Sequence, residues 1–153
     1  MFIFKFGKRP GLHQKNLGLT IKVLTHKFKI MPHTMDYSAL VSTLDSLMEG
    51  FQLISPEWKY LYVNETVVKH ARCSSKKELI GRTMMEVFPG IEKTAMFKKL
   101  EDAMFQGLSS DFENEFIFPD GKTGWFELRV RPVNQGIFVL SFDITEKKLL
   151  SYM

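Results

Sequence analysis

Alternating acidic and basic side chains in the C-terminal half have the types and spacing that could support acid–base chemistry. Asp111, Glu113 and Glu115 alternate along the chain, so an extended strand would place them on one face. Neighbouring carboxylates of this kind can act as general acid and general base. Arg129 and Arg131 share a face of the following predicted strand, and ion pairs with Glu113 and Glu115 explain the pattern more simply. We predict a solvated rim without catalytic residues; a deep pocket holding Glu113 or Glu115 with a raised pKa would instead indicate a small enzyme.

Histidine and cysteine are too sparse for a metal site or a nucleophilic pair. After residue 35 the sequence contains one histidine, His70, and one cysteine, Cys73, and neither belongs to a metal-binding pattern. We predict that His70 faces solvent on a short polar helix and that Cys73 packs as an ordinary small side chain. A single cysteine cannot build a disulfide framework, which favours a reducing compartment such as the cytoplasm.

Charge is unevenly distributed along the 153 residues. Residues 1–35 contain seven of the 21 Lys and Arg residues and none of the 17 acidic residues, which leaves a net charge of −3 on residues 36–153. A nucleic-acid-binding domain needs a clustered basic face, so we predict no nucleic-acid partner. The basic leader, residues 1–35, lacks the order of a secretory signal and is predicted to be a loosely ordered tail. Contact between this leader and an anionic membrane surface is the alternative.

Hydrophobic spacing predicts one helix, two strands, several short helices and three further strands. A flanking segment, 36–49, holds the first helix, from Asp36 to Met48. Strands are expected at 51–54, 60–63, 111–118, 124–133 and 137–144, and short helices at 64–71, 75–81 and 82–88. A longer helix is expected from Glu92 to Gln106, because Gly107 can end it.

The last predicted strand is apolar on both faces. One face carries Ile137, Val139 and Ser141, and the other carries Phe138, Leu140 and Phe142. A strand of this kind must be covered on both sides. One side therefore meets the short helices, and the other needs the 36–48 helix, a partner chain, or both.

This order of elements, together with several short motifs, resembles a PAS sensory domain over most of residues 49–148. The matching stretches are Tyr60–Asn64, Glu78–Arg82, Glu86–Pro89, Asp120–Gly121, Trp125–Pro132 and Asp143–Lys148. The sequences of these motifs are most similar to those of PAS modules in bacterial sensor kinases. The resemblance implies an α+β fold whose five-stranded antiparallel sheet, of order 2-1-5-4-3, carries short helices on one face. It also implies a PAS domain over 50–146 and the start of an output linker helix over 147–153.

The resemblance also bears on cofactors. Light-sensing flavin members of the family carry a reactive Cys two residues after the Arg of a Gly-Arg motif, and this sequence has Met84 there. The polar amides that contact the flavin ring in those members are replaced by Phe126 and Ser141. Haem-binding members use a His on the long helix, and the stretch from Glu92 to Gln106 contains none. We therefore predict neither flavin nor haem, and no metal.

An apolar space between helices and sheet is the remaining candidate site. Strand alternation and the apolar stripe of the long helix place around it Phe88, Met96, Leu100, Phe116, Phe126, Leu128, Val130, Val139 and Ser141. Large Phe and adaptable Met side chains fill gaps well, so a filled core is favoured over a ligand site. If a ligand binds, we expect it to be small and largely apolar, with Ser141 as its polar anchor.

The sequence thus predicts a non-enzymatic cytoplasmic signalling module that acts through a ligand- or partner-dependent conformational shift. Its signal relay would comprise Asp143, Thr145 and Glu146, because Asp143 and Glu146 have the spacing of a capping box. A homodimer is expected through an apolar surface formed by Leu40, Leu44, Leu47, Phe138, Leu140 and Phe142. No output domain follows in this sequence, so we expect either a fragment or a separate effector such as a kinase. The alternative is a PAS domain with a filled core that only mediates assembly.

Overall fold

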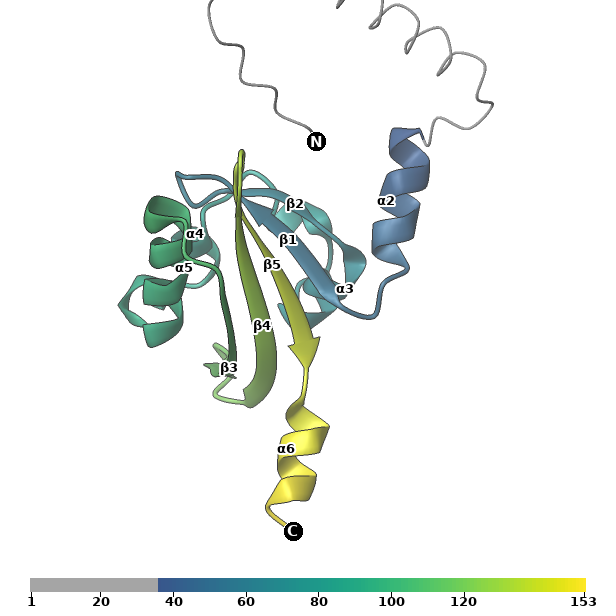
Figure 1. The fold of residues 1–153 in the computed structure, drawn as a ribbon. Coiled ribbons are helices and arrows are strands. Elements are labelled where there is room, and N and C mark those ends of the chain that lie inside the picture. The colour runs from purple at the N-terminus through teal and green to yellow at the C-terminus, as the bar shows by residue number, and fades with distance from the viewer. Residues whose placement is uncertain (1–35) are drawn as a thin grey trace, which may run out of the picture. The chain divides into compact units, whose positions relative to one another are not determined.

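A five-stranded antiparallel sheet in the order β2-β1-β5-β4-β3 organises residues 36–153, the part of the chain that the computed structural model describes (Figure 1). The strands are β1 (Gly50–Ile54), β2 (Tyr60–Val63), β3 (Ser110–Ile117), β4 (Thr123–Val133) and β5 (Gly136–Asp143). The predicted fold class and strand order are confirmed. The predictions for the leader, residues 1–35, lie outside the described residues.

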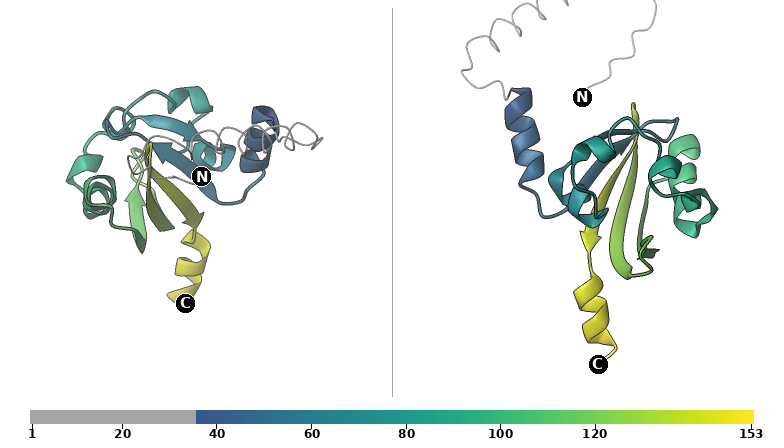
Figure 2. Two further views of the ribbon diagram at one scale, coloured as in Figure 1. Left: turned by 45° about the horizontal axis from the view of Figure 1, so that its top comes forward. Right: turned by 180° about the vertical axis from the view of Figure 1, so that it is seen from behind.

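The helices precede, cover and follow this sheet. They are α2 (Tyr37–Asp45), α3 (Glu65–His70), α4 (Met84–Val87), α5 (Ala95–Gln106) and α6 (Thr145–Ser151), with single 3-10 turns η1 (Lys76–Glu78) and η2 (Ile91–Lys93). Figure 2 shows α3, α4 and α5 on one side of the sheet, which we call the inner face. The opposite side is the outer face. Segments between β2 and β3 therefore enclose the core against the inner face.

The core lies between the inner face and these helices. Its most deeply buried large side chains are Ile54, Leu79, Leu100, Ile137, Val63 and Val130. They come from four strands, a loop and α5, so the predicted alternation of β4 and β5 contributes to one continuous apolar layer. Burial of this surface from water is the main stabilising contribution to the fold.

Asn64 joins the first strands to the helices through a fully buried amide. Its Oδ1 accepts hydrogen bonds from the backbone N–H groups of Phe51, at 2.9 Å, and Val67, at 3.1 Å. Its Nδ2 donates to the carbonyl oxygens of Leu44, at 2.8 Å, and Glu49, at 2.9 Å. The predicted cap of α3 is therefore also the group that fixes the end of α2 beside β1.

Two helix boundaries differ from the prediction because side chains take over backbone hydrogen bonds. The helix predicted for 36–48 ends at Asp45, and the Leu47 carbonyl beyond it accepts from the Thr66 hydroxyl at 2.6 Å. The helix predicted for 92–106 is divided at Thr94, whose hydroxyl oxygen accepts from the Phe97 N–H at 3.1 Å and starts α5. Side-chain caps of this kind end one helix and begin the next.

Candidate ligand cavity and signal relay

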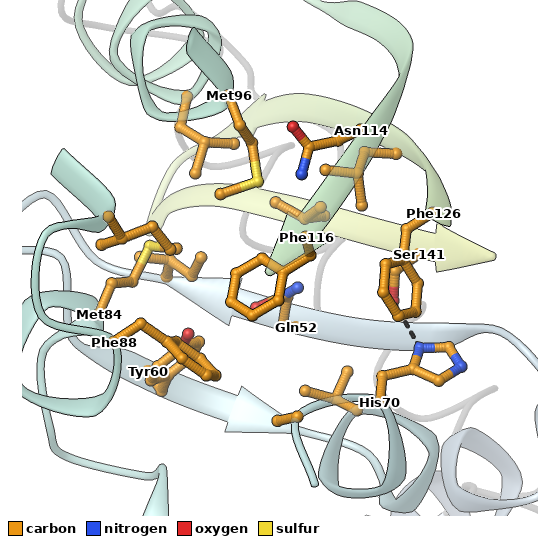
Figure 3. Close-up of a pocket in the computed structure, with 17 residues that line it drawn as sticks. Gln52, Tyr60, His70, Met84, Phe88, Met96, Asn114, Phe116, Phe126 and Ser141 are labelled. Carbon is orange, nitrogen blue, oxygen red and sulfur yellow. Dashed lines mark hydrogen bonds between the residues drawn. The ribbon is translucent and has the colours of Figure 1, made fainter. Parts of the chain in front are cut away.

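A cavity of about 90 Å³ lies between the inner face and the helices (Figure 3). The predicted pocket residues that line it are Phe88, Met96, Leu100, Phe116, Phe126, Leu128, Val139 and Ser141. Val130 is not among the lining residues: it is fully buried in the core and pairs with Val139 on the neighbouring strand. The arrangement thus gathers side chains of β3, β4, β5, α5 and the α4 end around one space.

His70 lines this cavity, so the prediction that it faces solvent is wrong. Its Nδ1 lies 3.1 Å from Ser141 Oγ, and its ring centroid lies 5.1 Å from that of Phe126. His70 follows buried Val67 by three residues, a spacing that places both on one helix face. Burial lowers the pKa of His70, while the Asp143 carboxylate acts in the opposite direction. The neutral imidazole is therefore favoured near neutral pH.

Gly50 makes the close approach of β1 to this polar pair possible. A Cβ atom at this position would lie 2.2 Å from Ser141 Oγ, 3.0 Å from His70 Nδ1 and 3.0 Å from Val67 Cγ2. Contacts under about 3 Å are sterically forbidden, so only glycine fits without displacement of its neighbours. The hydrogen bond between His70 and Ser141 is thus held directly against the backbone of β1.

Three further polar residues of the lining were missed by the sequence analysis: Gln52, Tyr60 and Asn114. Alternation carries the signal for two of them. Gln52 precedes buried Ile54 by two residues, and Asn114 precedes the lining residue Phe116 by two. Tyr60 is 3% exposed, and burial raises the pKa of its hydroxyl well above the usual range. The cavity is therefore more polar than the predicted apolar space.

A second cleft of about 340 Å³ opens on the far side of Ala71 and Phe88, which line both spaces. Arg72 is one of the residues that line this second cleft. The guanidinium donates to both carboxylate oxygens of Asp120, at 3.1 and 2.9 Å, and lies 3.6 Å from the Phe118 ring centroid. Cys73 also borders this cleft, and burial raises the pKa of its thiol, which disfavours the nucleophilic thiolate.

The junction between β5 and α6 contains the predicted relay residues Asp143, Thr145 and Glu146. The expected capping box does not form: Asp143 Oδ1 accepts from the Thr145 N–H at 2.9 Å, and α6 has no side-chain cap at Ile144. Thr145 Oγ1 instead accepts from the Trp125 N–H at 3.0 Å. The first residue of α6 is thereby attached to β4 as well as to β5.

The outer face carries an aromatic cluster on its β1–β5 side. The Phe51 and Phe138 rings stack at 5.8 Å, and the Phe142 ring lies 4.8 Å from the Arg129 guanidinium. Phe138, Leu140 and Phe142 are half-buried within the described part of the chain. On α2, Leu44 is half-buried and Leu40 and Leu47 are exposed. The predicted dimer surface is therefore apolar and accessible.

The charged residues of the outer face pair differently from the prediction. Asp111, not Glu113, accepts from Arg131, at 2.6 Å, and Arg129 contacts Glu127 of its own strand at 2.9 Å. Glu113 instead forms an ion pair with Lys148 of α6. The hydrogen bond from Arg131 holds the pKa of Asp111 below its usual value. These carboxylates lie on the exposed face and do not line the cavity.

Two other kinds of feature are absent from residues 36–153. No three or more His, Cys, Asp or Glu side chains in this range are arranged to hold a metal ion. Within the same range, no helix combines the length and apolarity needed to cross a membrane.

Comparison with known proteins places this geometry in a family. Residues 44–149 match the PAS fold family. The PAS domain of a protein from Colwellia psychrerythraea has a TM-score of 0.57 and 17% identity, over 71% of this chain and 97% of that one. The photoactive yellow protein domain of the sensor histidine kinase Ppr from Rhodospirillum centenum has a TM-score of 0.51 and 17% identity, over 67% and 91%.

A third similar structure belongs to a DNA-binding receptor. The Vibrio cholerae VqmA dimer has a TM-score of 0.62 and 18% identity, over 73% of this chain and 53% of that one, and VqmA has also been solved bound to DPO. No curated protein matches this sequence. The match over residues 44–149 shows that the chain belongs to the PAS family, whose domains are signal-sensing modules.

Proposed function

We propose that this PAS domain senses a small molecule held in the inner cavity and transmits its presence through β5 into α6. One observation supports the proposal above all: Val139 and Ser141 line the cavity, and the strand that carries them leads directly into α6. A ligand that contacts this strand can therefore favour one arrangement of the β5–α6 junction over another.

The relay follows from contacts at both ends of β5. Ser141 meets the His70 ring of α3, so displacement of either side chain by a ligand alters how α3 and β5 are joined. Two residues further on, Asp143 and Thr145 position the start of α6 against Trp125. A ligand changes the populations of two states only if it binds them with different affinity.

We also propose that the domain forms homodimers through the outer face and α2. The supporting feature is the apolar surface defined by Leu40, Leu44, Leu47, Phe138, Leu140 and Phe142, since surfaces of this kind commonly mark protein contacts. The effector is proposed to be a signalling protein such as a kinase, either separate or joined to this domain in a longer chain, and the location to be cytoplasmic. The similar domain from a sensor histidine kinase gives a precedent for such an output.

Flavin and haem are proposed not to occupy the cavity. At about 90 Å³ it is smaller than the roughly 150 Å³ cavity that accepts a single benzene ring in an engineered protein. Met96 projects from α5 into the cavity where haem-binding relatives would need a His, and a Met on a buried helix stripe is usually core.

The small cavity also favours a second candidate function, a PAS domain that only mediates assembly. Phe88, Phe116 and Phe126 occupy much of the space between helices and sheet. In that case the same outer surface would pair whether or not a small molecule is present.

Native mass spectrometry of the chain purified from its own host separates the two candidates. Sensing predicts a bound small molecule whose removal changes the dimer population, whereas assembly predicts a stable dimer without any bound molecule. Phe142→Glu is expected to abolish the dimer, because a buried unpaired carboxylate is strongly unfavourable. Leu108→Glu, at an exposed loop position, is the matched control and should leave the dimer intact. An unchanged mass for Phe142→Glu would exclude the outer face as the interface.

A further inference from the structure

The cavity lining is polar without being charged. Among the residues that line it there is no Asp, Glu, Lys or Arg, and burial keeps the pKa of His70 low. The charged pair Arg72 and Asp120 borders the second cleft instead. A charge enclosed in this lining would lose hydration without gaining a partner of opposite charge, which is strongly unfavourable. The lining therefore selects against ionic ligands.

Two polar groups of the cavity have no protein partner within the described residues. Tyr60 is 3% exposed, yet no described group hydrogen-bonds to its hydroxyl, which points into the cavity (Figure 3). The Gln52 side-chain amide faces the same space and is likewise without a hydrogen bond to the described protein. Of the other polar lining residues, His70 and Ser141 pair with each other, and Asn114 Nδ2 donates to the Glu115 carbonyl at 3.1 Å.

Groups without a protein partner are available to a partner from outside the chain. A ligand that accepts a hydrogen bond from the Tyr60 hydroxyl is favoured over one that leaves this hydroxyl unpaired. The amide of Gln52 offers both a donor and an acceptor. Size sets the remaining limit: the cavity of about 90 Å³ is smaller than the roughly 150 Å³ that holds one benzene ring, so a ligand of one ring requires the flexible side chains of Met84 and Met96 to move aside.

We propose that the cavity binds a neutral molecule of about one ring that carries a hydrogen-bonding group, held by the Tyr60 hydroxyl and the Gln52 amide. This assignment rests on the proposed sensing function and adds the chemical class of the ligand. It also replaces Ser141 as the expected anchor, since the hydroxyl of Ser141 is already paired with His70.

Three probes of one ring size test the proposal on the full chain: phenol, benzene and benzoate. Chemical-shift titrations are expected to show phenol binding about tenfold more tightly than benzene, and benzoate binding more weakly than either. Tyr60→Phe removes one hydroxyl oxygen, so it should weaken the affinity for phenol about tenfold and leave the affinity for benzene unchanged. Gln52→Met, in which the new side chain has a similar shape, should also weaken the affinity for phenol. Tyr62→Phe, which removes a hydroxyl directed at Asp45, is the control and should change neither.

The outcomes separate this proposal from the sensing function. If benzene binds as tightly as phenol, or if Tyr60→Phe leaves phenol binding unchanged, the assigned ligand class is wrong although the cavity still binds small molecules. Benzoate binding as tight as that of phenol would likewise overturn the neutral class. If no probe binds, the assigned ligand class fails, whereas the sensing function fails only if native mass spectrometry finds a stable dimer without any bound molecule.

Discussion

The two faces of the sheet handle polar groups in opposite ways. On the outer face, charged side chains pair with one another, as Asp111 does with Arg131 and Glu113 with Lys148. On the inner face, no charged side chain of residues 36–153 lines the cavity, and the Tyr60 hydroxyl and Gln52 side-chain amide have no hydrogen-bond partner among those residues. The outer face is thus built to be satisfied by the protein and solvent. The inner face carries hydrogen-bonding groups without a partner among the described residues, a property expected of a binding surface.

The largest expected effect comes from removing a ring on the inner face. Phe126→Ala should lower the free energy of unfolding by about 3–5 kcal/mol, because Phe126 is buried against His70 and its loss leaves a cavity. Phe142→Ala, on the half-buried outer face, should lower the free energy of unfolding by less than half of that amount. Urea denaturation of both variants measures the difference, and equal losses would remove the distinction between the faces.

Gly50→Ala tests the close contact of β1 with the pair of His70 and Ser141. The new methyl group would lie 2.2 Å from Ser141 Oγ, so we expect a loss of about 1–3 kcal/mol. Adding Ser141→Ala should recover part of that loss, since it removes the oxygen that is overlapped. Strictly additive losses in urea denaturation would show that the two positions do not interact.

Acidification should weaken the fold through His70. Burial holds its pKa below the ordinary value of 6.5, so as the pH falls below that value the unfolded chain takes up a proton before the folded chain does. Unfolding then binds a proton, and stability declines until the pH passes the folded pKa. The urea midpoint of the natural sequence should fall more between about pH 7.5 and 5.5 than that of His70→Gln. Equal changes would mean that His70 titrates as if exposed.

The smallest effect is expected on the charged outer face. Arg131→Gln should leave the urea midpoint nearly unchanged, because its partner Asp111 is solvent-exposed. The change should shrink further in about 1 M salt. A larger loss that persists in salt would place this ion pair among the structural contacts of the sheet.

Much of the fold follows from local sequence patterns. The turn residues and alternation that predict five strands also fix which side chains face inward, and the double-sided β5 indicates a central position. The same alternation places Gln52 and Asn114 on the inner face, and helical spacing places His70 beside the buried Val67, so the sequence could have predicted all three as lining residues. The prediction omits Gln52, Asn114 and His70 because it considers mainly apolar side chains.

Other features depend on contacts that no local pattern specifies. The local sequence predicts Asn64 as a helix cap. Its hydrogen bonds to the carbonyl oxygens of Leu44 and Glu49, however, depend on where the end of α2 lies in the folded domain. The pairing of Glu113 with Lys148 requires the position of α6 beside β4. The unpaired state of the Tyr60 hydroxyl is likewise a property of the assembled cavity.

Because successive residues of β5 point to opposite sides, Val139 touches the cavity while its neighbours Phe138 and Leu140 form part of the outer surface. A tilt of β5 would therefore move both sets of side chains together. Under the proposed sensing function, only the thickness of one strand separates the ligand from the dimer surface.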